Sequence, residues 1–135
     1  MHPWRRLREL AHVTLLWHDG GPKGVTDFAD QTISLRRGMS QAERRSTVLH
    51  ECLHIERGPV LTTLAAREEL RVERETARLL LPCIRTVGEA LAWAFDLDEA
   101  ADELWVDTQL LRCRLESLHP AERHYLKARL TSDGE

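Results

Sequence analysis

Short apolar stretches that alternate with polar residues occupy the first part of the chain. Such alternation over four to eight residues is typical of β-strands. The stretches are Val13–Trp17, Val25–Phe28 and Thr32–Leu35, and turns rich in glycine and aspartate separate them. An amphipathic stretch from Pro3 to Ala11 comes first. The pattern predicts a short helix followed by a small sheet of about three strands.

After residue 40 the apolar residues recur at helical spacing. Ser40, with Glu43 three residues later, forms a capping box that predicts a helix start. Gly58 and Pro59 end that helix. Further helices are predicted over residues 64–81, 86–95, 97–105, 108–118 and 120–130. The sequence therefore predicts an α+β fold in which a small N-terminal sheet packs on the first long helix and a helical C-terminal part follows.

The first long helix contains His50-Glu51-Cys52-Leu53-His54. Residues four apart lie on one face of a helix, so His50 and His54 can bind one metal ion with Glu51 beside them. This spacing is typical of a zinc metallopeptidase whose glutamate is the general base. Apolar residues on nearly every side predict that the helix is mostly buried, and buried histidine and glutamate need partners.

A catalytic zinc site with two histidines needs a third protein ligand. In the helix over residues 64–81, Glu69 and Glu73 fall among the apolar positions, whereas Glu68 and Glu75 fall on the charged side. The predicted apolar positions are Ala65, Leu70, Val72, Thr76, Ala77, Leu79, Leu80 and Leu81. A buried carboxylate is costly unless it is paired or binds metal. We therefore predict Glu69 as the third ligand and Glu73 as hydrogen-bonded to a ligand histidine; the reverse assignment stays open.

Composition narrows the function classes. A chain of 135 residues with a net charge of −3 suits one globular domain, 1–135, with a catalytic core over about 1–82 and a helical subdomain over about 83–131. We expect neither a membrane helix nor a secretory signal. The three cysteines, an odd number, predict reduced thiols in the cytoplasm. Cys52 lies two residues from each histidine and is expected to point away from a metal.

The segment 97–118 is similar to a helix-turn-helix. A version that binds DNA should be basic. Here the first helix and the turn are acidic, with Asp96, Asp98, Glu99, Asp102, Glu103 and Asp107. The segment therefore predicts a structural element or a protein-docking surface, and direct DNA binding is not expected.

Several of these motifs together resemble the ImmA/IrrE family of metallopeptidases. The matching runs are Ile33–Leu35, Ala42–Arg45, Thr47–His54 and Ala77–Pro82. The Trp105-Val106-Asp107 turn and Arg114-Leu115 look similar to the helical tail of actinobacterial and phage members. The resemblance covers about residues 32–118. One departure is Cys52-Leu53, where the family usually has Leu-Gly; the bulkier leucine beside the ligands is expected to narrow the cleft or weaken activity.

The resemblance implies a small intracellular zinc endopeptidase that acts on a DNA-binding regulator, often a repressor of a mobile element or a stress gene. It implies an α+β fold with a sheet on a zincin-type active-site helix. His50, Glu51 and His54 carry over directly, and Glu69 with Glu73 fits the family's later acidic helix. The alternative is a non-catalytic protein that binds a regulator and has a structural or vestigial zinc site, with Cys52 or Glu73 as a fourth protein ligand.

Overall fold

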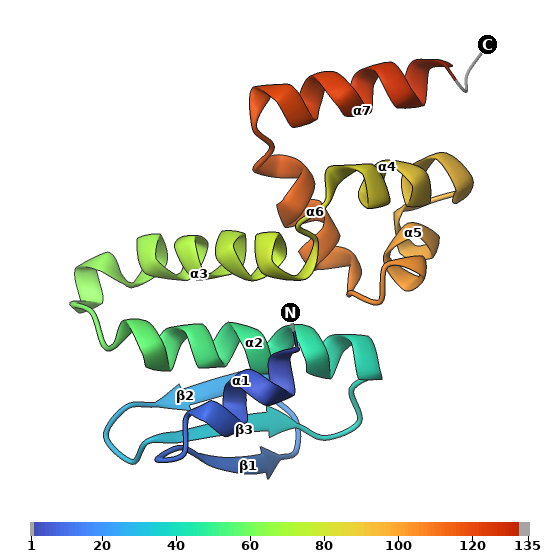
Figure 1. Cartoon of the computed structure of the whole chain (residues 1–135). Helices are drawn as coiled ribbons and strands as arrows, with labels where there is room; N and C mark the ends of the chain where they lie inside the picture. The colour runs from blue at the N-terminus through green and yellow to red at the C-terminus, as the bar shows by residue number, and fades with distance from the viewer. Residues whose placement is uncertain (1, 133–135) are drawn as a thin grey trace. The chain divides into compact units, whose positions relative to one another are not determined.

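A computed structural model describes residues 2–132 of the chain. In chain order the elements are α1 (Pro3–Glu9), β1 (Thr14–His18), β2 (Gly24–Asp27), β3 (Thr32–Arg36), α2 (Gln41–Arg57), a short 3-10 turn (Thr62–Leu64), α3 (Ala65–Leu80), α4 (Ile84–Trp93), α5 (Leu97–Glu103), α6 (Thr108–Glu116) and α7 (Pro120–Ser132) (Figure 1). The α+β class with a small sheet is confirmed. No helix within residues 2–132 combines the length and the apolar character needed to cross a membrane.

The chain forms two compact units, Met1–Thr76 and Ala77–Glu135. The division falls inside α3. The sequence predicts the boundary between the catalytic core and the helical subdomain slightly later, at about residue 82.

The sheet of the first unit has β3 at its centre. Its strand order is β1-β3-β2, with β3 parallel to β1 and antiparallel to β2. Ile33 and Leu35 of β3 are fully buried, while the residues between and beside them are partly exposed. This alternation gives the sheet one apolar face, and α2 packs on β2 and β3.

Helix α2 has the start and the end that the sequence predicts. The Ser40 hydroxyl accepts a hydrogen bond from the Glu43 backbone N–H at 3.1 Å, and the Ser40 backbone N–H donates to the Glu43 carboxylate at 3.1 Å. Gly58, with φ of 84°, follows the last turn. Because an L-residue with a side chain is strained at positive φ, glycine suits this end.

The centre of α2 is buried, as its sequence predicts. Val48 and Cys52 join Ile33, Leu35 and Met39 in the apolar core of this unit. Helix α1 packs alongside α2 and contributes Trp4 and Leu7 to the edge of the core. Cys52 therefore points into the core, as predicted, and burial raises its pKa to about 12.

The face that α3 buries matches the predicted one over its later turns, where Val72, Ala77 and Leu80 are buried, and differs from it in the first turns. Glu68, Val72 and Thr76, at intervals of four residues, are buried, whereas Ala65 and Leu70 are exposed. The prediction that Glu68 lies on the charged side was wrong. Its carboxylate accepts two hydrogen bonds from the Arg57 guanidinium, at 2.5 and 2.8 Å, and this pairing makes its burial tolerable.

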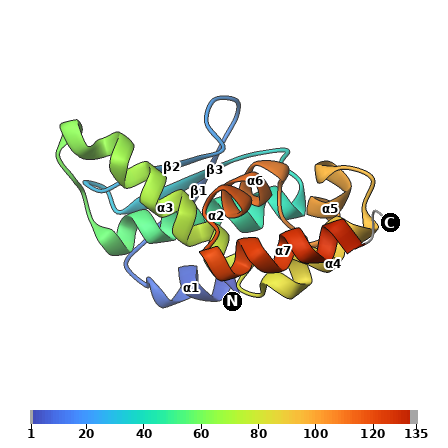
Figure 2. The ribbon, with the colours of Figure 1, turned by 90° about the horizontal axis from the view of Figure 1, so that it is seen from above.

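In the second unit, α4 packs against α5 and α7, and α5 packs against α6; Figure 2 shows α7 running beside α4. The fully buried Arg114 donates to the Leu81 carbonyl at 2.8 Å and to both oxygens of Glu122 at 3.0 and 2.6 Å. Asp107 caps α6, as predicted, by accepting from the Leu110 N–H at 2.7 Å. Helices α5 and α6 follow one another with a short turn between them, and the similarity to a helix-turn-helix stays a prediction.

Candidate metal centre

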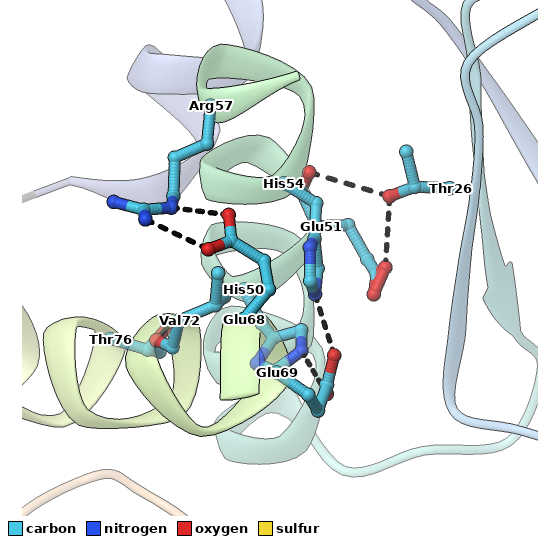
Figure 3. Close-up of polar contacts among 9 residues, drawn as sticks. All are labelled: Thr26, His50, Glu51, His54, Arg57, Glu68, Glu69, Val72 and Thr76. Carbon is cyan, nitrogen blue, oxygen red and sulfur yellow. Dashed lines mark hydrogen bonds and ion pairs between the residues drawn. The ribbon is translucent and has the colours of Figure 1, made fainter. Parts of the chain in front are cut away.

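His50 and His54 lie one turn apart on α2, and both face one carboxylate on α3. The distance from His50 Nε2 to Glu69 Oε1 is 2.7 Å, and that from His54 Nε2 to Glu69 Oε2 is also 2.7 Å (Figure 3). The two imidazole rings meet edge to face, with centroids 4.9 Å apart. The structure thus brings together the histidine pair and the acid that the sequence predicts as third ligand.

The donor atoms at this site suit zinc. Ligand atoms of His50, Glu51 and His54 all lie within 4.8 Å of one another, and Glu69 is within hydrogen-bond distance of both histidines. Two imidazole nitrogens and a carboxylate are the protein ligands of many catalytic zinc sites. Glu69 accepts a hydrogen bond from each Nε2, and a metal ion bound at these nitrogens would take the place of those protons.

Glu51 is buried beside the histidines and is held by strand β2. The Thr26 hydroxyl lies 3.0 Å from Glu51 Oε2, to which it donates, and 3.4 Å from the Glu51 backbone carbonyl. Gly24 lies so close that an added Cβ would be 2.9 Å from Glu51 Cγ and 2.6 Å from Thr47 Cγ2. Only glycine leaves room for the Glu51 side chain at this position.

Sequence reasoning missed Gly24 and Thr26. They are two residues apart on β2, so they lie on the same face of the strand. A glycine at the start of a strand, followed on the same face by a hydroxyl residue, was the available signal for a close approach to another element. It does not say which element approaches.

The charges of the site shift its pKa values in different directions. Burial raises the pKa of Glu51. Burial by itself lowers the pKa of His50, but the hydrogen bond to Glu69 and the charges of nearby carboxylates outweigh it and raise the pKa overall. Hydrogen bonds from His50 and His54 hold the pKa of Glu69 far below its usual range. A buried carboxyl with a raised pKa suits a general base.

The neighbouring acids of α3 differ in their partners. Glu68 pairs with Arg57, and that hydrogen bond lowers its pKa. Glu69, whose side chain is 49% exposed, pairs with the histidines. Glu73 is half-buried one turn later and acts on His50 through its charge. Its predicted hydrogen bond to a ligand histidine is absent from the contacts of residues 2–132, and its role at a metal-loaded site stays a prediction.

No protein-family model matches this chain, and neither a curated protein nor a solved structure matches it significantly. The resemblance to ImmA/IrrE metallopeptidases therefore stays a prediction from the sequence motifs.

Proposed function

We propose that the chain is a zinc-dependent endopeptidase that acts on a regulatory protein. One observation carries the proposal: His50 and His54 both reach the Glu69 carboxylate, while the buried Glu51 is held beside them. His50, His54 and Glu69 would hold the zinc, in a zincin-type arrangement of a sheet packed on the active-site helix. When bound, zinc lowers the pKa of water and polarises the scissile carbonyl.

In the proposed mechanism the other residues of the site transfer the proton from water to the leaving amine. Glu51 takes it from the attacking water and passes it to the leaving amine. Thr26 donates to one carboxylate oxygen of Glu51 and so orients the other oxygen for this transfer. Burial raises the pKa of Glu51, which helps it to hold the proton between the two steps.

The proposed substrate is a DNA-binding regulator, such as a repressor of a mobile element or a stress response. The resemblance of the motifs to the ImmA/IrrE family supports this choice. The acidic α5 and the turn after it argue against direct contact with DNA, because like charges repel.

A second function is favoured by the contacts of Glu69. Its carboxylate hydrogen-bonds to both histidines, a pairing that a protein with a structural or vestigial zinc site would keep as well. A protein of this kind would bind its regulator without cutting it, with a zinc site that is structural or vestigial. Cys52 lies in the apolar core, which leaves it no part in a closed site of four protein ligands.

The test is the zinc content of the purified protein, measured by mass spectrometry. We expect about one zinc per chain in the wild type and in the Glu51→Gln variant, and none in His50→Ala or Glu69→Ala. Glu75→Ala, which removes an exposed carboxylate on the same helix, is the matched control and should keep the metal.

Cleavage of the regulator should then be lost in Glu51→Gln although zinc is retained. Cleavage by that variant would contradict the proposed mechanism. A wild-type protein that refuses added zinc would leave the binding function as the conclusion.

A further inference from the structure

The second unit leaves three large aromatic side chains in solvent around α5. Phe95, in the connection before α5, is 96% exposed, and Trp93 and Trp105 are each more than half exposed. The core of this unit is filled by other residues: Val87, Ala90, Ala100, Ala101, Val106, Leu110, Leu111 and Leu126. After folding, the largest apolar side chains of the unit therefore keep more than half of their surface accessible. The three residues lie at the two ends of α5, and large apolar side chains exposed close together in the chain are candidates for contact with a partner.

The stretch of sequence that carries these aromatic residues is acidic. From Thr86 to Leu111 the sequence contains no lysine, arginine or histidine. Asp98 and Asp102 lie one turn apart on the exposed side of α5, and Glu103 follows them. No cationic side chain within residues 2–132 pairs with Asp102 or Glu103. Within the described part of the chain, the carboxylates of Asp102 and Glu103 therefore face solvent without a counter-charge.

The exposed aromatic side chains and the acidic residues together indicate what kind of partner fits. An acidic surface repels nucleic acids and anionic membranes and attracts basic proteins. Tryptophan rings bind lysine and arginine through their faces, and tryptophan is among the residues that contribute most to protein interfaces. Phe95 and the two tryptophans are complementary to an apolar patch on the partner. The carboxylates of Asp98, Asp102 and Glu103 are complementary to cationic side chains around that patch.

We propose that the surface formed by residues 93–105 binds a protein partner that presents lysine and arginine around an apolar patch. The residues that carry this proposal all belong to the second unit. It therefore does not depend on zinc or on cleavage, and it extends the proposed function by giving the chain a separate place to hold a partner.

The test uses the full chain and a fluorescein-labelled amphipathic peptide of lysine and leucine, with binding measured by fluorescence anisotropy. Phe95→Ser, and separately the pair Asp102→Lys with Glu103→Lys, should each weaken binding about tenfold or more. The matched control pair, Glu9→Lys with Glu116→Lys, changes the net charge equally at sites elsewhere and should leave affinity within about twofold. Thermal melting checks that each variant folds.

Three results would overturn the proposal. The first is equal weakening by the α5 pair and the control pair, because general charge attraction would then explain binding. The second is equal binding of a glutamate–leucine peptide, which would make the surface merely apolar. The third is self-association of the wild type in light scattering that Phe95→Ser removes, because the surface would then be an interface between copies. A failure here leaves the zinc and cleavage results unaffected, so the two proposals fail separately.

Discussion

Each unit contains a carboxylate held by two basic side chains, and the two centres differ in what those side chains can do. In the first unit Glu69 meets His50 and His54 at 2.7 Å each. In the second unit Glu122 meets Arg114 at 2.6 and 3.0 Å, with Arg78 also near at 3.6 Å. The contact geometry is similar, but histidine loses its proton near neutral pH and binds metals, whereas arginine stays charged.

The two centres also differ in how deeply their side chains are buried. Arg114 is only 1% exposed and Glu122 16%, while the Glu69 side chain is 49% exposed. The hydrogen bond from Arg114 lowers the pKa of Glu122 to about 2. The arginine-held pair is thus a fixed part of the fold, and the histidine-held pair has the side chains that the proposed zinc site requires. The partner of a carboxylate, more than the carboxylate itself, decides whether the centre is structural or chemical.

The largest effect is expected for His50→Arg, which makes the first centre resemble the second. The introduced guanidinium would still pair with Glu69 but could not bind zinc. Since zinc binding by four ligands releases about 10–16 kcal/mol, the loss of one ligand should cost about 3–4 kcal/mol, or several hundredfold in affinity. Competition with a chelating dye measures this. Unchanged zinc affinity in this variant would place the metal elsewhere.

Next in size is Glu122→Gln. It leaves the buried Arg114 without its counter-charge, and breaking a buried pair in this way costs about 3 kcal/mol or more. Urea unfolding, followed by circular dichroism, should show the loss, while zinc content stays at the wild-type value. A loss of stability below about 1 kcal/mol would mean that this pair behaves as a surface ion pair.

The same pair predicts a loss of stability in acid. The folded pKa of Glu122, about 2, lies below its ordinary value of 4.5. A depressed carboxyl pKa stabilises the fold above the ordinary value, and this contribution disappears as the pH falls from about 4.5 towards 2. Melting temperatures across this range should fall less steeply in Glu122→Gln than in the wild type. Parallel curves would contradict the assignment.

The smallest effect is expected for Thr26→Val, which removes one hydrogen bond from Glu51 and keeps the shape. We expect cleavage to fall about tenfold, because a hydrogen bond to a charged group contributes about 1.5 kcal/mol. Loss of the donor raises the pKa of Glu51 further, so the acid limb of the pH–rate profile should move to higher pH. Zinc content should be unchanged. An unshifted profile would show that Thr26 does not position the base.

The helix ends and the strands were predictable because they depend on residues close together in the sequence. Ser40 with Glu43, Gly58 and Asp107 determine helix ends through contacts within a few residues, and the helices begin or end where these residues indicate. The three strands are present, with ends shifted by one residue or so from the predicted ones.

The errors come from contacts between distant residues. A helical wheel ranks Glu68 and Glu69 by their apolar neighbours on α3, but Arg57 of α2 decides that Glu68 is the buried one. Gly24 and Thr26 lie beside Glu51 because β2 packs on α2. The position of β2 depends on its pairing with another strand, which the sequence of β2 alone does not predict.

The strand order β1-β3-β2 has a consequence for the order of events in folding. Strands β1 and β2 are consecutive in sequence, yet each hydrogen-bonds with β3 and not with the other. A newly made chain therefore cannot complete a local hairpin from its first thirty or so residues. The strand that supports Glu51 finds its place only when β3 inserts, and α2 follows β3 almost at once. The sheet and the helix that carries Glu51 are therefore expected to assemble together, before α3 brings Glu69 to the two histidines.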